Sequence, residues 1–401
     1  MSELRQDVRY GLRALAASPG FTAVALLSLS LGICIATCAF SQMNGMALRS
    51  LPGVWSPAEL VALQSPASFP HYRRYREQDD FFSSSMAYAA PVPFAVSLNG
   101  YTERTWGHLV TASYFSTLGV HPALGTFFHP TQETQSQAST VVVSHRFWRD
   151  RLGGDPLAIG RTIRINGQPS TIIGIAPDDF LGASPLLFAA DLWMPVTVGG
   201  GIAPELADNA LERRDVAMFF VVGRLRSGVT IARAEAQLDA VARTFERDHG
   251  NTERGLKHRR VLLVEGGKLL PLRKQDVPFF TSFLTIMAAL IMLIACANVA
   301  NMMLARGAGR RREIAVRLAL GASRGRLIRQ MLTESMLLVV AAGAVGSLAS
   351  RWLMTLGSQV QMPFPMPVAF DFRPDGRVLL WTFALCLCTG VVFGLAPALQ
   401  S

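Results

Sequence analysis

Few residues in this chain have the types and spacing that catalysis needs. Gly267-Lys268 comes nearest to a phosphate-binding loop, but Leu262 stands where the first glycine belongs, and Leu269 where Ser or Thr belongs. The sequence has no His-Glu-x-x-His zinc motif and no Cys-x-x-Cys pair, and no two of its 7 histidines lie four residues apart. We therefore expect no catalytic residue, no metal, no cofactor and no nucleotide hydrolysis by the phosphate-loop route.

Polar groups within the apolar stretches have simpler explanations than a binding site. Cys34 and Cys38 lie four residues apart, which places them on one helix face. A metal site there is conceivable, but we favour packing of small apolar side chains. Glu334 stands at the inner end of an apolar stretch, and we favour a structural role over a mechanistic one.

The densest charge in the chain is a run of arginines at residues 305–330. This segment holds eight arginines and one acid, Glu313, for a net charge of +7. Residues 49–277 carry 24 basic and 22 acidic groups, a net +2 over a far longer stretch. Short loops rich in Lys and Arg remain in the cytoplasm, so we expect residues 305–330 and both chain ends inside and residues 49–277 outside. The overall charge of +10 then reflects topology, and we exclude nucleic acid as a partner.

Long apolar stretches predict four transmembrane helices. The chain is 50% hydrophobic and only 16% charged, against about 25% charged residues in soluble proteins. A spanning helix needs about 20 mostly apolar residues. The stretches that meet this condition are residues 21–48, 278–304, 330–353 and 378–399. The first is longer than a signal-peptide core, so we interpret it as uncleaved. We expect a multi-pass protein of the cytoplasmic (inner) membrane with a cytoplasmic N-terminus.

The remaining short segments flank or connect these spans. Residues 1–20 predict a basic amphipathic helix on the inner leaflet, with a plain extension of the first span as the alternative. Residues 305–329 predict a loop with a short cytoplasmic helix that Gly321 is placed to end. Residues 354–377 predict a short, proline-rich outer loop.

Residues 49–277 predict a mixed α+β domain outside the membrane. Two Asn-Gly pairs flanked by apolar residues predict β-hairpins, because this dipeptide favours tight hairpin turns. The pairs are Asn99-Gly100 and Asn166-Gly167. Thr230 is placed to cap a long amphipathic helix. The alternation of strands and helices favours two small lobes, with a boundary near residues 177–204.

Small residues in the third and fourth spans predict close packing between helices. Gly343 and Gly346 belong to a small-residue stripe in the third span, and Gly390 and Gly394 form a Gly-x-x-x-Gly pair in the fourth. Such spacing lets helix backbones approach closely. Chance spacing in glycine-rich spans is the alternative.

Several segments together resemble a known family. The strongest is residues 312–330, Arg-Glu-Ile-Ala-Val-Arg-Leu-Ala-Leu-Gly-Ala-Ser-Arg-Gly-Arg-Leu-Ile-Arg-Gln, followed by Thr333-Glu334-Ser335. Other segments that contribute are residues 4–13, 19–22, 113–120 and 223–230. This pattern resembles the permease family of macrolide-exporter (MacB) and FtsX type, which belongs to the ABC systems. The opening residues are similar to the longer, duplicated permeases of this group.

The resemblance implies a MacB-like periplasmic core domain of two lobes between spans one and two. It also implies a separate ABC ATPase and a homodimer or a heterodimer of permeases. In the family, the segment corresponding to residues 312–330 carries the coupling helix. By carry-over, the residues that contact the ATPase are Arg312, Glu313, Arg317, Leu320, Gly321 and Ala322. From charge alone, these arginines could instead only fix topology and bind anionic lipid.

The expected function is that of a permease subunit that transmits ATP-driven motion of a separate ATPase across the membrane to the periplasmic domain, for export or extraction of a substrate. The alternative is a membrane-anchored scaffold or sensor that recruits a periplasmic protein without transport. Unlike the macrolide exporter, this chain does not contain the ATPase. It is either a complete four-span unit or one half of a duplicated permease. No residue pattern identifies the substrate.

Overall fold

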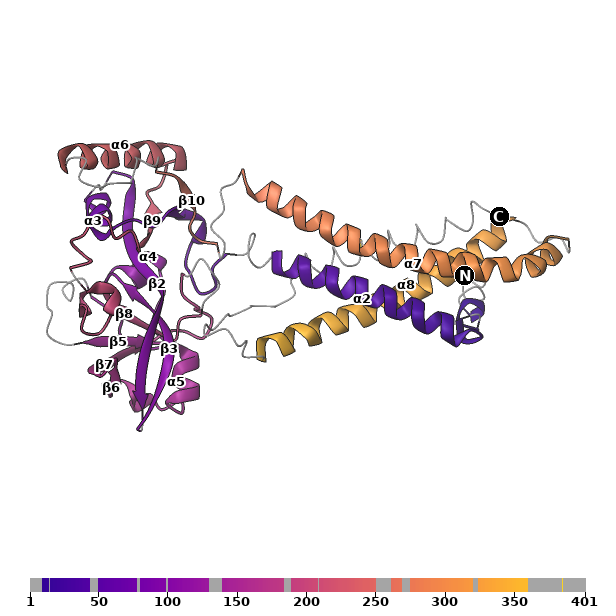
Figure 1. Cartoon of the computed structure of the whole chain (residues 1–401), viewed down its shortest axis with the longest axis horizontal. Helices are drawn as coiled ribbons and strands as arrows, with labels where there is room; N and C mark the ends of the chain where they lie inside the picture. Colours follow the sequence, from indigo (N-terminus) through magenta and orange to yellow (C-terminus); the bar gives the residue numbers. More distant parts are fainter. Residues whose placement is uncertain are drawn as a thin grey trace. The chain divides into compact units, whose positions relative to one another are not determined.

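The computed structural model of the chain contains two compact units (Figure 1). One is built from long helices, and the other from the strands and short helices that lie between the first and second of these in sequence. The residues that the structure describes are 9–13, 15–43, 50–77, 80–98, 100–129, 139–183, 189–207, 209–249, 261–268, 275–319, 324–359 and 384.

The helical unit contains three long helices in its described part. They are α2 (Pro19–Met43), α7 (Val277–Ala319) and α8 (Arg324–Gln359). Each contains a stretch long and apolar enough to cross a membrane; the stretches are Pro19–Ser41, Val277–Val299 and Thr333–Leu353. They fall within the first three predicted spans or overlap them closely. The predicted fourth span, residues 378–399, lies outside the described residues except for position 384.

Helix α7 differs from the expected arrangement of its segment. The sequence predicted a span ending near residue 304, followed by a separate short helix. In the structure, one helix runs from Val277 to Ala319 without interruption. At a rise of about 1.5 Å per residue, such a helix is about 64 Å long. The backbone of residues 305–319 is therefore the continuation of α7.

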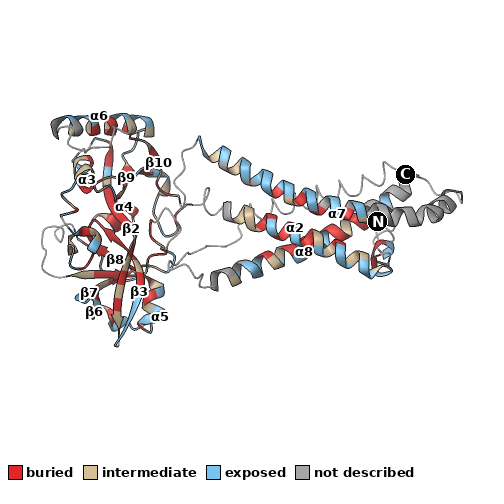
Figure 2. Ribbon diagram, viewed as in Figure 1, coloured by how far each residue is buried: buried red, intermediate tan, exposed pale blue. Residues whose placement is uncertain are grey.

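Helices α2 and α8 pack together through apolar and small residues. Leu29 and Ile33 of α2 are fully buried, and Leu338 and Ala342 of α8 are buried in the same cluster. Figure 2 shows that this contact is red while much of the outward helix surface is pale blue. The outward surface carries large apolar side chains, such as Leu293 of α7 at 65% exposure, which suits a hydrocarbon environment.

The outer unit contains a ten-stranded sheet. Its strands are β1 (Leu60–Leu63), β2 (Phe82–Leu98), β3 (Tyr101–Val110), β4 (Leu124–Gly125), β5 (Thr140–Val143), β6 (Thr162–Ile165), β7 (Gln168–Ile175), β8 (Leu192–Pro195), β9 (Phe220–Leu225) and β10 (Leu263–Glu265). Both predicted hairpins are confirmed, since Leu98 pairs with Tyr101 and Ile165 pairs with Gln168. Asn166 and Gly167 both have positive φ, at 48° and 81°, as a tight hairpin turn requires.

Strand pairing divides this sheet into two parts that share β2. At one end the order is β10-β1-β9-β2. At the other, β2, β3, β8, β5, β7 and β6 pair in succession, and β6 pairs again with β2, which closes a six-stranded ring. The predicted boundary at residues 177–204 does not separate the two parts, because it contains β8, which belongs to the ring.

The short helices are α3 (Phe69–Arg76), α4 (Tyr114–Leu118), α5 (His145–Arg151) and α6 (Ile231–His249). Helix α6 begins as predicted, with the Thr230 hydroxyl accepting a hydrogen bond from the Arg233 amide at 3.3 Å. Two carboxylates of α6 then accept hydrogen bonds from the segment that forms β10. Asp239 binds the Val261 amide at 3.1 Å, and Glu235 binds the Leu263 amide at 2.8 Å. These bonds satisfy donors that an edge strand would otherwise expose.

Alternating side chains of the strands supply two apolar cores. In β5, Val141 and Val143 point into one core and Val142 into the other. The same alternation holds in β8, where Trp193 enters the second core. That second core is rich in aromatic rings, and it includes residues from both parts of the sheet, so it joins them. Alternate side chains of each strand therefore enter opposite cores, and both parts of the sheet belong to one domain.

His108 lies in this second core with only 1% of its surface exposed. Its ring stacks on Tyr88, with centroids 5.6 Å apart, and its Nδ1 lies 3.3 Å from the Tyr114 hydroxyl. Nε2 has no hydrogen-bond partner among the described residues. Burial of the imidazole lowers the pKa of His108 to about 3, because the charged form has lost its hydration.

This burial predicts a loss of stability in acid. Unfolded histidine titrates near pH 6.5, so below that pH the unfolded chain binds a proton that the folded domain excludes. The free energy of unfolding should fall by about 1.4 kcal/mol per pH unit from this residue as pH drops from about 6 to 4. Replacing His108 by Phe should remove that part of the slope in urea unfolding of the full-length protein. The same change at exposed His121 is the control; equal slopes in the two variants would contradict the assignment.

Candidate functional site

The two chain segments that connect the outer unit to the membrane helices meet at one place, which we call the base (residues 50–60 and 263–268). Ser50 forms a β-bridge with Lys268, and the Leu51 amide donates to the Gly267 carbonyl at 2.7 Å. Farther along, β1 pairs with β10 in antiparallel register. The segment that follows α2 is therefore hydrogen-bonded to the segment that precedes α7.

Two glycines make this close pairing possible. A Cβ atom on Gly266 would lie 2.7 Å from the carbonyl carbon of Val61, and one on Gly267 would overlap the carbonyl oxygen of Pro57. Any larger residue would force the two segments apart. The sequence analysis considered Gly267 only as part of a phosphate loop, and its structural role is this contact.

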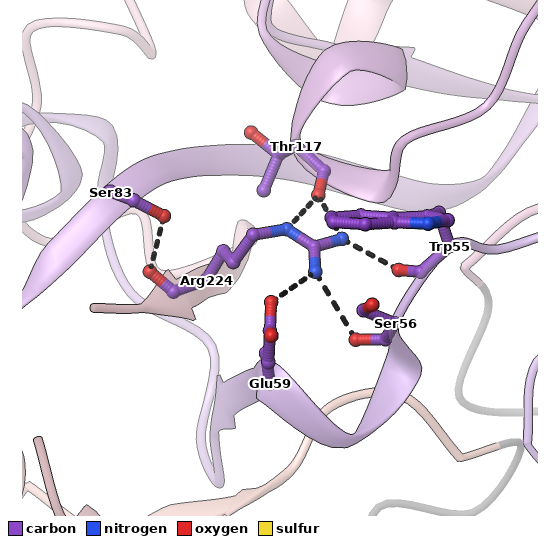
Figure 3. A network of polar contacts seen from close by, with 6 residues as sticks. All are labelled: Trp55, Ser56, Glu59, Ser83, Thr117 and Arg224. Atoms are coloured by element: carbon purple, nitrogen blue, oxygen red, sulfur yellow. Dashed lines mark hydrogen bonds and ion pairs between the residues drawn. The ribbon is translucent and has the colours of Figure 1, made fainter. Parts of the chain in front are cut away.

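Arg224 of β9 fixes the base to the rest of the domain (Figure 3). Its side chain donates to the carbonyl oxygens of Trp55 (2.8 Å), Ser56 (3.1 Å) and Thr117 (3.0 and 3.2 Å), and to the Glu59 carboxylate (2.9 Å). We call these five residues the Arg224 clamp. Only the planar guanidinium, with its five N–H donors in a fixed fork, can bind acceptors on so many sides at once.

The energetics of the clamp come mainly from its backbone acceptors. The Glu59 side chain is 51% exposed, so its ion pair with Arg224 is screened by water. Arg224 itself is only 8% exposed, and its guanidinium lies 5.2 Å from the centre of the Trp55 ring. The Trp55 and Thr117 carbonyl groups depend on these donors, because an acceptor left unpaired away from water costs about 1–3 kcal/mol. The Ser56 carbonyl also accepts from the Glu59 amide at 3.1 Å.

The clamp connects distant parts of the sequence. Thr117 belongs to α4, Trp55 and Ser56 precede β1, and β9 pairs with both β1 and β2. Arg224 therefore connects the segment after α2 to β9 and α4 through hydrogen bonds. The sequence analysis noted residues 223–230 as family-like but gave Arg224 no role. A lone arginine within the apolar run Phe-Val-Val-Gly-Arg-Leu was the available signal.

A second close contact lies between the membrane helices α2 and α8. The Ser30 hydroxyl donates to the Ala342 carbonyl at 3.2 Å. A Cβ atom on Gly346 would lie 2.8 Å from the Ser30 carbonyl oxygen and 3.1 Å from Ile33. Small residues of this kind let helix backbones approach in an apolar environment. Gly343, the neighbouring residue of the predicted stripe, is also buried.

The other sequence-predicted site residues are only partly described. Arg312, Glu313 and Arg317 lie on the last turns of α7, and their side chains are outside the described residues. Five further predicted residues are wholly outside them; these are Leu320, Gly321, Ala322 and the glycine pair Gly390 and Gly394 of the fourth span. ATPase docking by the first group and helix packing by the glycine pair stay predictions.

The described residues contain no cluster of three or more His, Cys, Asp or Glu side chains that could hold a metal ion. Cys34 is buried and Cys38 half-buried, both as free thiols within α2.

A two-part extracytoplasmic domain inserted between long apolar helices is the architecture of a multi-pass membrane permease, and comparison with known families agrees. Residues 22–241, more than half of the chain, match the MacB-like periplasmic core domain, and residues 285–401 match the FtsX-like permease C-terminal domain. The chain therefore belongs to the MacB/FtsX-type permease family of the ABC systems.

The chain is also similar in sequence to curated members of this family. The chain is 24% identical over 288 residues to the macrolide export ATP-binding/permease protein MacB of Burkholderia cenocepacia, covering 71% of this chain and 38% of the relative. It is 25% identical over 309 residues to the protein of the same name from Salmonella paratyphi A, covering 77% and 42%. The chain thus spans less than half the length of these relatives.

A solved structure of the periplasmic region of MacB from Actinobacillus actinomycetemcomitans also matches. The match has a TM-score of 0.39 and 12% sequence identity, and it covers 57% of this chain and 94% of the solved one.

The Arg224 clamp predicts that loss of its donors loosens the base. Replacing Arg224 by Met keeps the apolar stem but removes the donor from the Trp55 and Thr117 carbonyl groups, whereas the Ser56 carbonyl keeps the Glu59 amide. We therefore expect a local cost of about 1–3 kcal/mol. Hydrogen exchange of residues 50–60 in the full-length protein should then accelerate about tenfold or more. Glu59→Gln is the matched control and should have a much smaller effect, because its ion pair is exposed. Equal protection in wild type and Arg224→Met would rule out the clamp.

The helix contact predicts sensitivity to added volume at one position of α8. Gly346→Leu forces a side chain into the Ser30 backbone and should separate α2 from α8, at a cost of about 1–3 kcal/mol. The midpoint of thermal denaturation in detergent should fall. Ala344→Leu adds a similar volume at an exposed position of the same helix and should leave the midpoint nearly unchanged. A tolerated Gly346→Leu would show that the contact is not tight.

Proposed function

We propose that this chain is a permease subunit that transmits ATP-driven motion from a separate ABC ATPase across the membrane to the outer domain. The observation that carries the proposal is the continuity of α7. A single helix contains both the arginine-rich segment up to Ala319 and the apolar stretch that begins at Val277. A displacement of one end of a continuous helix moves the other end, because its backbone hydrogen bonds resist bending.

The outer domain is built to receive such a displacement. Both membrane-connecting segments are hydrogen-bonded to one another at the base, so neither can move alone. The Arg224 clamp joins the base to β9 and α4. Because β9 pairs with β2, and β2 belongs to both parts of the sheet, motion at the base reaches the six-stranded ring through hydrogen-bonded strands.

The ATPase is expected to dock on the arginine-rich end of α7 and the residues after it. The curated relatives are named ATP-binding/permease proteins, whereas this sequence has no phosphate-binding loop. We assign docking to the segment that contains Arg312, Glu313, Arg317 and Gly321. A net charge of +7 over residues 305–330 favours acidic surfaces on the partner.

The proposed assembly has four spans, with the N-terminus and residues 305–329 in the cytoplasm. The +7 segment supports this orientation, since it is the strongest topological signal in the sequence. Two permease units, identical or related, would pair in the membrane. The work performed would be export or extraction of a substrate.

The alternative is a membrane-anchored scaffold or sensor that recruits a periplasmic protein. The observation that favours it is the shortage of polar groups in the described spans. Within the stretches Pro19–Ser41, Val277–Val299 and Thr333–Leu353, a carboxylate is supplied by Glu334, which is 8% exposed and near one end. A permease that works on its outer side by mechanical means needs no polar path either, so this observation does not displace the main proposal.

Charge reversal in the docking segment tests the proposal. Full-length protein purified in mild detergent should recover an ATPase, and Arg317→Glu should lower its permease-dependent ATP hydrolysis at least tenfold. Arg74→Glu is the matched control, because Arg74 has a 42% exposed side chain in the outer domain. If no ATPase is recovered, or if both reversals behave alike, the proposal fails. A stable periplasmic partner bound independently of ATP would then favour the scaffold.

A further inference from the structure

Trp55 is an exposed aromatic residue at the base of the outer domain. Its surface is 64% exposed, whereas Trp193 in the aromatic core of the same domain is fully buried. A large ring left in water at a fixed place suggests a surface to which it binds.

The backbone and stem of Trp55 are held rigidly. Its amide donates to the Leu118 carbonyl at 3.1 Å, and its carbonyl accepts from Arg224 at 2.8 Å. A Cβ atom on Gly119 would lie 2.8 Å from the Cβ of Trp55, so these two residues are in close contact. One side of the indole lies near the Arg224 guanidinium. The exposed part of the ring is therefore presented by a fixed frame.

Short connections join this frame to the apolar helices. Helix α2 ends at Met43, and Ser50, seven residues later, is already paired at the base. Seven extended residues reach at most about 25 Å. On the return path, Val277 lies nine residues after Lys268, with a reach of at most about 32 Å. Because Ser50 and Lys268 pair with one another, both tethers leave from the same edge of the domain.

We propose that the Trp55 indole lies in the phospholipid headgroup layer of the outer leaflet and holds the base against the membrane surface. Indole rings prefer this layer, where an apolar body and a polar N–H are both accommodated. This inference uses the extracytoplasmic position of the domain and does not depend on ATP-driven transmission. Trp55 would then contact lipid through its indole ring while its carbonyl group accepts a hydrogen bond from Arg224 in the clamp.

The test compares tryptophan emission of full-length protein in nanodiscs made with ordinary or brominated phosphatidylcholine. The signal of Trp55 is the difference between wild type and W55F, a change that keeps an aromatic ring beside Arg224. We expect this difference signal to be quenched at least twofold by the brominated lipid and to be protected from aqueous iodide. W352F gives the positive control, because Trp352 lies within an apolar stretch of α8 with 68% exposure.

W106F gives the negative control, because Trp106 lies on β3 in the ring, where Arg104 stacks on it at 4.8 Å. Its difference signal should be insensitive to the brominated lipid. Quenching of Trp55 by iodide but not by brominated lipid would place the indole in water and overturn the proposal. Protection from both quenchers would place it against protein, either another segment or a second copy, and would also overturn it. Matching circular dichroism of W55F and wild type confirms that the comparison concerns folded protein.

Discussion

The guanidinium of Arg224 is the interaction on which the base of the outer domain depends. It donates to three backbone carbonyl groups that lie outside the strands of the sheet. Its partners lie between 107 and 169 residues away in sequence. One side chain therefore fixes the geometry of segments that local structure alone would leave independent. The Glu59 carboxylate balances the charge but is too exposed to hold the site by itself.

The two units of the protein are stabilised by different physical effects. The outer domain buries two apolar cores on alternate sides of its strands, so removal of apolar surface from water drives its folding. The helical unit exposes much of its apolar surface. In hydrocarbon that surface gains nothing from burial, and contact between helices depends instead on close approach at small residues and on hydrogen bonds such as that from Ser30 to Ala342.

Local features could be predicted from the sequence, and non-local ones could not. The two Asn-Gly hairpins, the Thr230 cap and the first three apolar spans depend on short stretches, and the structure contains all of them. The closure of the ring joins β2 to β6 across about 70 residues, and no local pattern encodes it. The continuity of α7 was missed because the change from apolar residues to arginines near position 305 was interpreted as the end of a helix. Gly307 and Gly309 lie within the helix. A helix interior tolerates glycine at a cost of about 1 kcal/mol each, which a long helix can absorb.

The closed ring of six strands also has a consequence for mechanical load. An open sheet pulled at one edge can separate strand by strand, breaking a few hydrogen bonds at a time. In the ring, β2 is bonded to β3 on one side and to β6 on the other, so the strand order closes on itself, although residues 101–106 of β3 pair with β2 alone. Tension directed along β2 acts across its antiparallel hydrogen bonds in shear, so several must rupture together. This lobe is accordingly suited to repeated pulling without unravelling.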